Sequence, residues 1–157
     1  MNLNISQSKI VLPVLILILI CFSVRGQDNT SYDPELAKTF GADEYGMKSY
    51  VLVILKKGKR SDFSEEKRKE LFAGHQTNMQ RWLREGKLIV SGPFYPNEAD
   101  MEGIFILDIP FEEARDVLDS DPAISAQALS YEAYRWYGSA ALPVYLETHK
   151  KIQKIKP

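Results

Sequence analysis

Residues 50–55, with the sequence Tyr-Val-Leu-Val-Ile-Leu, are the feature that most limits the folds open to this chain. They lie within a strand that we predict for residues 49–57, and they place apolar side chains on both of its faces. A strand with one face in water would alternate apolar and polar residues instead. The sheet that contains this strand must therefore be covered on both faces.

The remaining elements follow in an order that narrows the fold further. Ser64 can cap a helix that Gly86 would end, because serine hydroxyls accept free backbone N–H groups and glycine readily terminates helices. We predict helices over residues 65–85, 111–119 and 142–152, and further strands over residues 87–94, 103–109 and 127–137. The order β-α-β-β-α-β predicts an α+β fold of the ferredoxin-like type, with an extra C-terminal helix.

In such a fold the two helices between the strands cover only one face of the sheet. The second face needs another cover, and the same sheet from a second copy of the chain would supply it. We therefore predict a homodimer, which makes the fold a dimeric α+β barrel. The alternative is that the N-terminal arm and the tail helix cover this face.

The N-terminus is typical of a secretion signal. A polar start ends in Lys9, an apolar run covers residues 10–24, and cleavage after Gly26 is expected. The predicted organisation is a signal peptide over residues 1–26, an N-terminal arm over 27–47, and one α+β domain over 48–157 with its last helix from about residue 142. We expect an exported protein, periplasmic or extracellular. An uncleaved signal is the alternative, and it would be the only contact with a membrane.

Cleavage of this signal would change the charge and remove Cys21, which is the only cysteine. Of 20 basic residues Lys9 and Arg25 would be lost, leaving 18 against 21 acidic residues, a net charge of −3. This balance argues against a nucleic-acid partner, which normally requires a basic face. Without cysteine there is no disulfide and no thiolate, and two histidines alone make a protein-held metal improbable. We found no glycine-rich motif for a nucleotide cofactor and predict no cofactor.

His75 is the residue that most suggests chemistry. It lies on the apolar stripe of the first long helix, between Leu71 and Met79, and histidine is well suited to proton transfer near neutral pH. Asp121, after the second helix and before the rigid Pro122, is a candidate for the carboxylate that would orient it. The alternatives are a packed core histidine and an aspartate that only forms a local turn bond.

Trp82 and Trp136 are candidates for an aromatic pocket that would take a planar ligand, although core or dimer packing is the more common role of such residues.

The ordered set of short motifs in residues 50–137 resembles the YCII-related proteins, a family of the dimeric α+β barrel group. The matching residues are His75, Trp82, Leu83, Gly86, the run Leu-Ile-Val-Ser-Gly-Pro at 88–93, the run Glu-Glu-Ala at 112–114, and Asp121 with Pro122. The resemblance implies a dimer with a pocket beside the sheet and a His-Asp active site, whose roles fall on His75 and Asp121. Ser91 could supply a hydroxyl to that pocket. Some relatives look like lyases or dehalogenating enzymes that act on small ring compounds.

Three functional hypotheses follow. The first is a cofactor-free enzyme of the proton-transfer type, a lyase or isomerase on a small organic molecule, with His75 as general base or acid and Asp121 as its orienting partner. The second is a non-catalytic dimer that binds a small ligand or another protein. The third is a haem-binding relative in which His75 would hold the iron.

Overall fold

The computed structural model describes residues 30–155 and contains one four-stranded antiparallel sheet. Its strands are β1 (Met47–Lys57), β2 (Leu88–Pro93), β3 (Met101–Leu107) and β4 (Leu129–Ser139). The strand order is β2-β3-β1-β4, so the first and third strands occupy the centre. This topology confirms the predicted α+β, ferredoxin-like fold.

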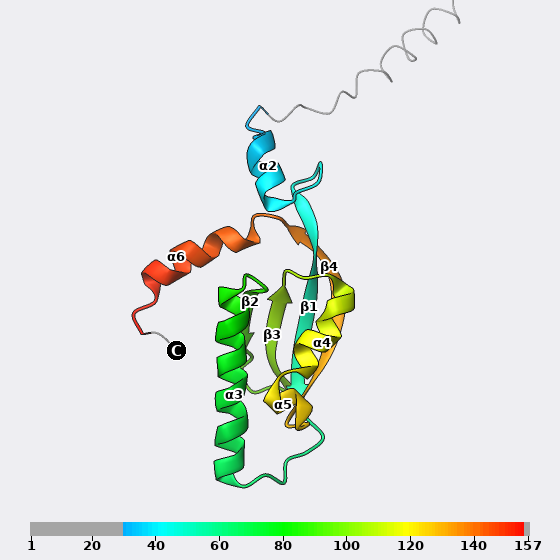
Figure 1. The fold of residues 1–157 in the computed structure, drawn as a ribbon, viewed down its shortest axis with the longest axis vertical. Helices are drawn as coiled ribbons and strands as arrows, with labels where there is room; N and C mark the ends of the chain where they lie inside the picture. Colours follow the sequence, from blue (N-terminus) through cyan, green and yellow to red (C-terminus); the bar gives the residue numbers. More distant parts are fainter. Residues whose placement is uncertain (1–29, 156–157) are drawn as a thin grey trace, which may run out of the picture. The chain divides into compact units, whose positions relative to one another are not determined.

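The helices are α2 (Pro34–Phe40), α3 (Glu65–Arg84), α4 (Ala114–Asp119), α5 (Pro122–Ser125) and α6 (Tyr145–Ile152), with 3-10 turns at Phe111–Glu113 and Leu142–Val144. Figure 1 shows α3, α4 and α5 on one side of the sheet, with α6 following the end of β4. The short helix α5 was not predicted. It forms because Asp121 caps its N-terminus and Pro122 occupies its first position, where a missing N–H costs nothing.

Helix α3 has the boundaries that local chemistry predicts. The Ser64 hydroxyl accepts the N–H of Lys67 at 3.2 Å, and two glutamates occupy the favourable first turn. After the last turn, Gly86 adopts a left-handed backbone with φ of 71°, which glycine tolerates without strain. The buried side chains of α3 are Leu71, His75 and Trp82, so the predicted stripe faces the sheet.

The main core lies between these helices and the sheet. Alternate residues of β1 point into it and meet side chains from β3, α3, α4 and α5. The strand residues are Val51, Val53, Leu55, Leu88, Phe105, Leu107 and Leu129, and the helix residues are Trp82, Ala114, Leu118, Ala123 and Ile124. We call this side of the sheet the helix face.

The opposite side, which we call the second face, is also apolar but is only partly covered. Tyr50, Ile89 and Ile106 are buried there, with Leu142 packed against them. The Tyr145 hydroxyl donates a hydrogen bond to the carbonyl of Ile89 at 2.6 Å. The start of the tail therefore covers one end of this face.

The rest of the second face has no such cover within residues 30–155. The side chains of Leu52 and Ile54 on β1, and of Ile104 on β3, are half-buried. Tyr134 on β4 pairs with Leu52 and is 50% exposed. The alternative in which the tail helix covers the second face therefore holds at one end of that face, and the centre stays partly exposed.

The segment before β1 is anchored by Asp43. Its carboxylate accepts the N–H groups of Tyr45 and Met47 at 2.9 and 3.0 Å, and it accepts the hydroxyl of Tyr137 on β4. This hydrogen bond raises the pKa of Tyr137 to about 12.

The predicted signal peptide lies outside the described residues, and none of the helices in residues 30–155 has the length and apolar character needed to cross a membrane.

Gly74 allows α3 and α5 to approach closely. A Cβ atom added at Gly74 would lie 2.8 Å from Cγ of Pro122, well inside van der Waals contact. A larger residue at this position would therefore push α5, and Asp121 at its start, away from α3.

We predict that Gly74→Ala destabilises the protein although alanine is the better helix former. Helix propensity favours alanine by about 1 kcal/mol, whereas overpacking typically costs about 1–3 kcal/mol. Urea unfolding of Gly74→Ala, Pro122→Ala and the double variant measures the coupling. Removal of the proline ring should rescue Gly74→Ala. Equal effects of Gly74→Ala in both backgrounds would contradict the close contact.

Candidate active site

His75 lies in the middle of α3 and faces the sheet. The residue is 7% exposed, and its ring stacks on Phe105 of β3 with 5.9 Å between ring centroids. Phe72, one turn earlier in α3, lies edge-on to the imidazole with 6.2 Å between ring centroids. The two aromatic rings therefore fix the plane of the imidazole.

Asp121 is the other buried polar residue of this region, and its side chain has no exposed surface. One carboxylate oxygen, Oδ1, accepts the N–H of Ala123 at 2.9 Å and that of Ile124 at 3.4 Å. These are N-cap bonds, and they satisfy donors that the first turn of α5 would otherwise leave unpaired. Asp121 therefore forms the local bonds to the backbone that the sequence suggested, and it forms hydrogen bonds with α3 as well.

The other oxygen joins Asp121 to α3. His75 Nδ1 lies 3.0 Å from Asp121 Oδ2, and the Asn78 amide donates to the same oxygen at 3.4 Å. His75 and Asp121, the pair that the sequence suggested, therefore lie within hydrogen-bond reach of each other. A buried carboxylate is tolerated only where donors replace water, and four donors do so here.

This geometry selects one tautomer of the imidazole. An ionised carboxylate can only accept hydrogen bonds, so Nδ1 of His75 carries a proton and donates it to Asp121. In the neutral ring, Nε2 is then the unprotonated nitrogen with a free lone pair. The Asp121 carboxylate would also stabilise the imidazolium that forms when Nε2 takes up a proton.

Nε2 of His75 reaches the molecular surface. Among residues 30–155 it makes no hydrogen bond, yet no buried side-chain nitrogen or oxygen in that part of the chain lacks a partner. Nε2 must therefore belong to the small exposed part of the side chain, which is 8% of its area. A proton can enter or leave the ring at this atom.

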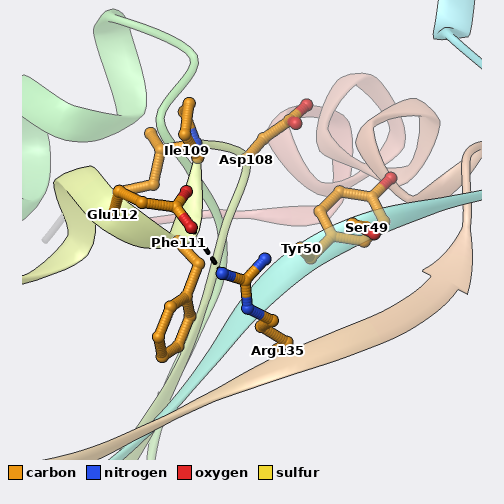
Figure 2. A pocket seen from close by; sticks show the side chains of 8 residues that line it. Ser49, Tyr50, Asp108, Ile109, Phe111, Glu112 and Arg135 are labelled. Carbon is orange, nitrogen blue, oxygen red and sulfur yellow. Dashed lines mark hydrogen bonds and ion pairs between the residues drawn. The ribbon is translucent and has the colours of Figure 1, made fainter.

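Two pockets lie elsewhere on the domain. The larger, about 320 Å³, is the Arg135 pocket between the start of β1 and the β3–α4 connection (Figure 2), with walls from Ser49, Tyr50, Asp108, Ile109, Pro110, Phe111, Glu112 and Arg135. The smaller, about 240 Å³, lies beside Lys59, Ile124, Gln127, Leu129, Ser130 and Tyr131. Neither pocket includes His75 or Asp121.

The other candidate residues are spread over both faces of the sheet. Ser91 on β2 pairs with Phe105, so its side chain is directed to the same face as the ring that stacks on His75. Trp82 is 2% exposed in the main core, with its ring edge-on to Phe105 at 6.2 Å. Trp136 lies on the second face against Tyr50, with ring centroids 5.8 Å apart.

Asn78 and Gly74 contribute to this site, and sequence reasoning did not identify them. Asn78 lies one turn after His75 and bridges Asp121 to α3 by hydrogen bonds from its amide to Asp121 Oδ2 and to the carbonyl of Ser120. In the sequence, Asn78 appears only as a polar amide beside an otherwise apolar stripe. That signal is ambiguous because such a residue commonly faces water.

Within residues 30–155, no group of three or more histidine, cysteine or acidic side chains is arranged to hold a metal ion.

No family model matches the chain, and no curated protein matches it, so the resemblance to the YCII-related proteins stays a prediction. Among solved structures, the chain is similar to 5-chloro-2-hydroxyhydroquinone dehydrochlorinase (TftG) from Burkholderia phenoliruptrix AC1100, in complex with 2,5-dihydroxybenzoquinone. The identity is 21%, the match covers 55% of this chain and 92% of that chain, and the TM-score is 0.40. This likeness is too distant to say what the present chain does.

We predict that Asp121→Asn inverts the tautomer of His75 while α5 keeps its cap. Asparagine caps helices as well as aspartate does, so its oxygen should retain the backbone N–H groups. Its NH₂ group then faces His75, whose Nδ1 must become the acceptor while Nε2 takes the proton. Long-range ¹H–¹⁵N correlation spectra of the imidazole distinguish the two tautomers. An Nδ1–H tautomer in both proteins would show that Asp121 does not orient the ring.

Proposed function

We propose that the protein is a cofactor-free enzyme of the proton-transfer type, a lyase or isomerase that acts on a small organic molecule. The observation that carries this proposal is the state of the His75 imidazole. Its Nδ1 is held by the fully buried Asp121 carboxylate, while Nε2 is unpartnered and reaches the surface. A histidine that served only packing would not need a buried charge on one nitrogen and access on the other.

The chemistry follows from these two nitrogens. Nε2 of His75 takes a proton from an acidic C–H group of the substrate, and the electron pair of that bond stays on the substrate. The resulting imidazolium is stabilised by Asp121 through the Nδ1 proton. In an isomerase His75 returns the proton to another atom. In a lyase the electron pair expels a leaving group, and the proton leaves with it or passes to water.

A second candidate function is non-catalytic binding of a small ligand. The observation that favours it is that neither described pocket includes His75 or Asp121. In that case the buried pair serves to join α3 to α5, and ligands bind elsewhere on the domain.

We predict that a ligand found by thermal-shift screening exchanges a carbon-bound hydrogen for deuterium in D₂O when the protein is present. The screen uses small carbonyl compounds and hydroxylated ring compounds, and ¹H NMR follows the exchange. Because general acid–base catalysis is typically worth about 10²–10⁴ in rate, His75→Gln should slow the exchange by at least about 100-fold.

His149→Gln is the matched control, since His149 is the other described histidine and lies exposed on α6. It should exchange at the wild-type rate. Exchange that survives His75→Gln would overturn the catalytic role of His75. A ligand that stabilises wild type and His75→Gln equally, without exchange in either, would support the binding function instead.

We further propose that two copies of the chain pack through their second faces. The half-buried residues Leu52, Ile54 and Ile104, with Tyr134 opposite Leu52, form an apolar surface at the centre of this face that is still partly exposed within residues 30–155. Such surfaces on soluble proteins generally mark an interface. Face-to-face packing of two sheets would bury it.

Light scattering should therefore report a dimer for the wild type. Ile104→Lys places a charge at the centre of the second face and should give a folded monomer. Tyr95→Lys, which changes an exposed side chain in the loop after β2, should remain dimeric. A monomeric wild type would rule out the dimer.

A further inference from the structure

The Arg135 pocket has a combination of charges that the proposed enzyme does not use. It lies at the end of the sheet where β3 leads into α4, and its lining does not include His75 or Asp121. Its volume of about 320 Å³ is at the lower end of the range for small-molecule sites.

The guanidinium of Arg135 has a fixed orientation, and its only ion pair is a weak one. The group lies over the ring of Phe111, 4.8 Å from its centroid, and pairs with the Glu112 carboxylate. Figure 2 shows the guanidinium extending across the pocket toward Glu112. Both side chains are 69% exposed, and exposed ion pairs contribute little to stability, so a ligand can displace Glu112 at low cost. A guanidinium binds a carboxylate through two parallel hydrogen bonds.

Two acidic residues contribute to the lining, and only Glu112 is directed at Arg135. The backbone N–H of Glu112 and then the Arg135 guanidinium hold the pKa of Glu112 below its ordinary value, so this carboxyl is charged at neutral pH. Asp108 is half-buried and is already paired, because Lys48 Nζ lies 2.7 Å from its Oδ1 and 2.8 Å from its Oδ2. Ser49 also lines the pocket, and its hydroxyl has no hydrogen-bond partner within residues 30–155.

This mixture disfavours ligands of a single charge. A simple anion that paired with Arg135 would face the Glu112 carboxylate, and a simple cation that paired with Glu112 would face the guanidinium. A molecule with one charge of each sign satisfies both kinds of wall, because electrostatic complementarity discriminates among partners.

We propose that the Arg135 pocket binds a small zwitterion of the α-amino acid type. The ligand carboxylate takes the Arg135 guanidinium in place of Glu112. The ligand ammonium group then pairs with the freed Glu112 carboxylate. An apolar ligand side chain packs against Ile109 and Phe111, which form the apolar part of the wall.

Isothermal titration with three matched probes tests this proposal. The probes are L-leucine, 4-methylpentanoate, which lacks the amino group, and 3-methylbutylamine, which lacks the carboxylate. Leucine should bind at least about tenfold more tightly than either fragment, a difference that titration resolves readily. Equal binding of leucine and 4-methylpentanoate would overturn the zwitterion assignment, as would no binding of leucine at millimolar concentration.

Two variants locate the site. Arg135→Gln should weaken leucine binding by at least about tenfold, an effect well within the resolution of titration. Arg81→Gln, which breaks a comparable exposed arginine–glutamate pair on α3, should leave it unchanged. In the wild type, leucine should shift the amide NMR signals of Ser49 and Ile109. Shifts confined to the surroundings of His75 would place the ligand at the other site and overturn the proposal.

Discussion

A carboxylate without exposed surface stands at the start of α5, and the arrangement of this half of the domain depends on it. Asp121 is stable there because its two oxygens receive separate sets of donors. One oxygen caps the N-terminus of α5, and the other is shared by His75 and Asn78 of α3. Removal of any one donor would leave part of a buried charge unsatisfied, which is among the most costly changes a protein interior can undergo. The same interaction thus joins two helices and sets the chemistry of the imidazole.

The packing around the Asp121 carboxylate holds α3, α5 and the His75 ring in these positions. Gly74 lets α3 approach Pro122, and the rings of Phe72 and Phe105 hold the plane of the His75 imidazole. Because these contacts fix the ring, its only free nitrogen has a defined direction. Fixed direction and tautomer are what a general base requires before a substrate arrives.

The two faces of the sheet divide the remaining roles. The helix face carries the main core and the His75–Asp121 pair. The Arg135 pocket lies near the opposite end of α4 from that pair. The second face carries an apolar centre that the tail covers at one end only. A central strand that is apolar on both sides, as in residues 50–55, produces this division, since each face then needs its own cover.

Much of this organisation is already determined by the sequence, because it depends on local periodicity and on caps. The apolar run at 50–55, the Ser64 cap and the stop at Gly86 give the strand and helix order, and His75 is evident as the one histidine on an apolar stripe. The close contact at Gly74 and the pairing of Asp121 with His75 could not be read in the same way. Both depend on the start of α5 meeting α3, and His75 and Asp121 are 46 positions apart in the chain.

Which nitrogen of His75 is free, and that it reaches the surface, is likewise decided only by the tertiary structure. A tautomer is set by the partner of the other nitrogen, and that partner is brought there by folding. The Arg135 pocket has the same origin, since β1, the β3–α4 connection and β4 each supply part of its wall. Sequence periodicity reports which side of an element faces the core. Only the packed structure brings the ends of different elements together, and there the polar groups of both sites meet.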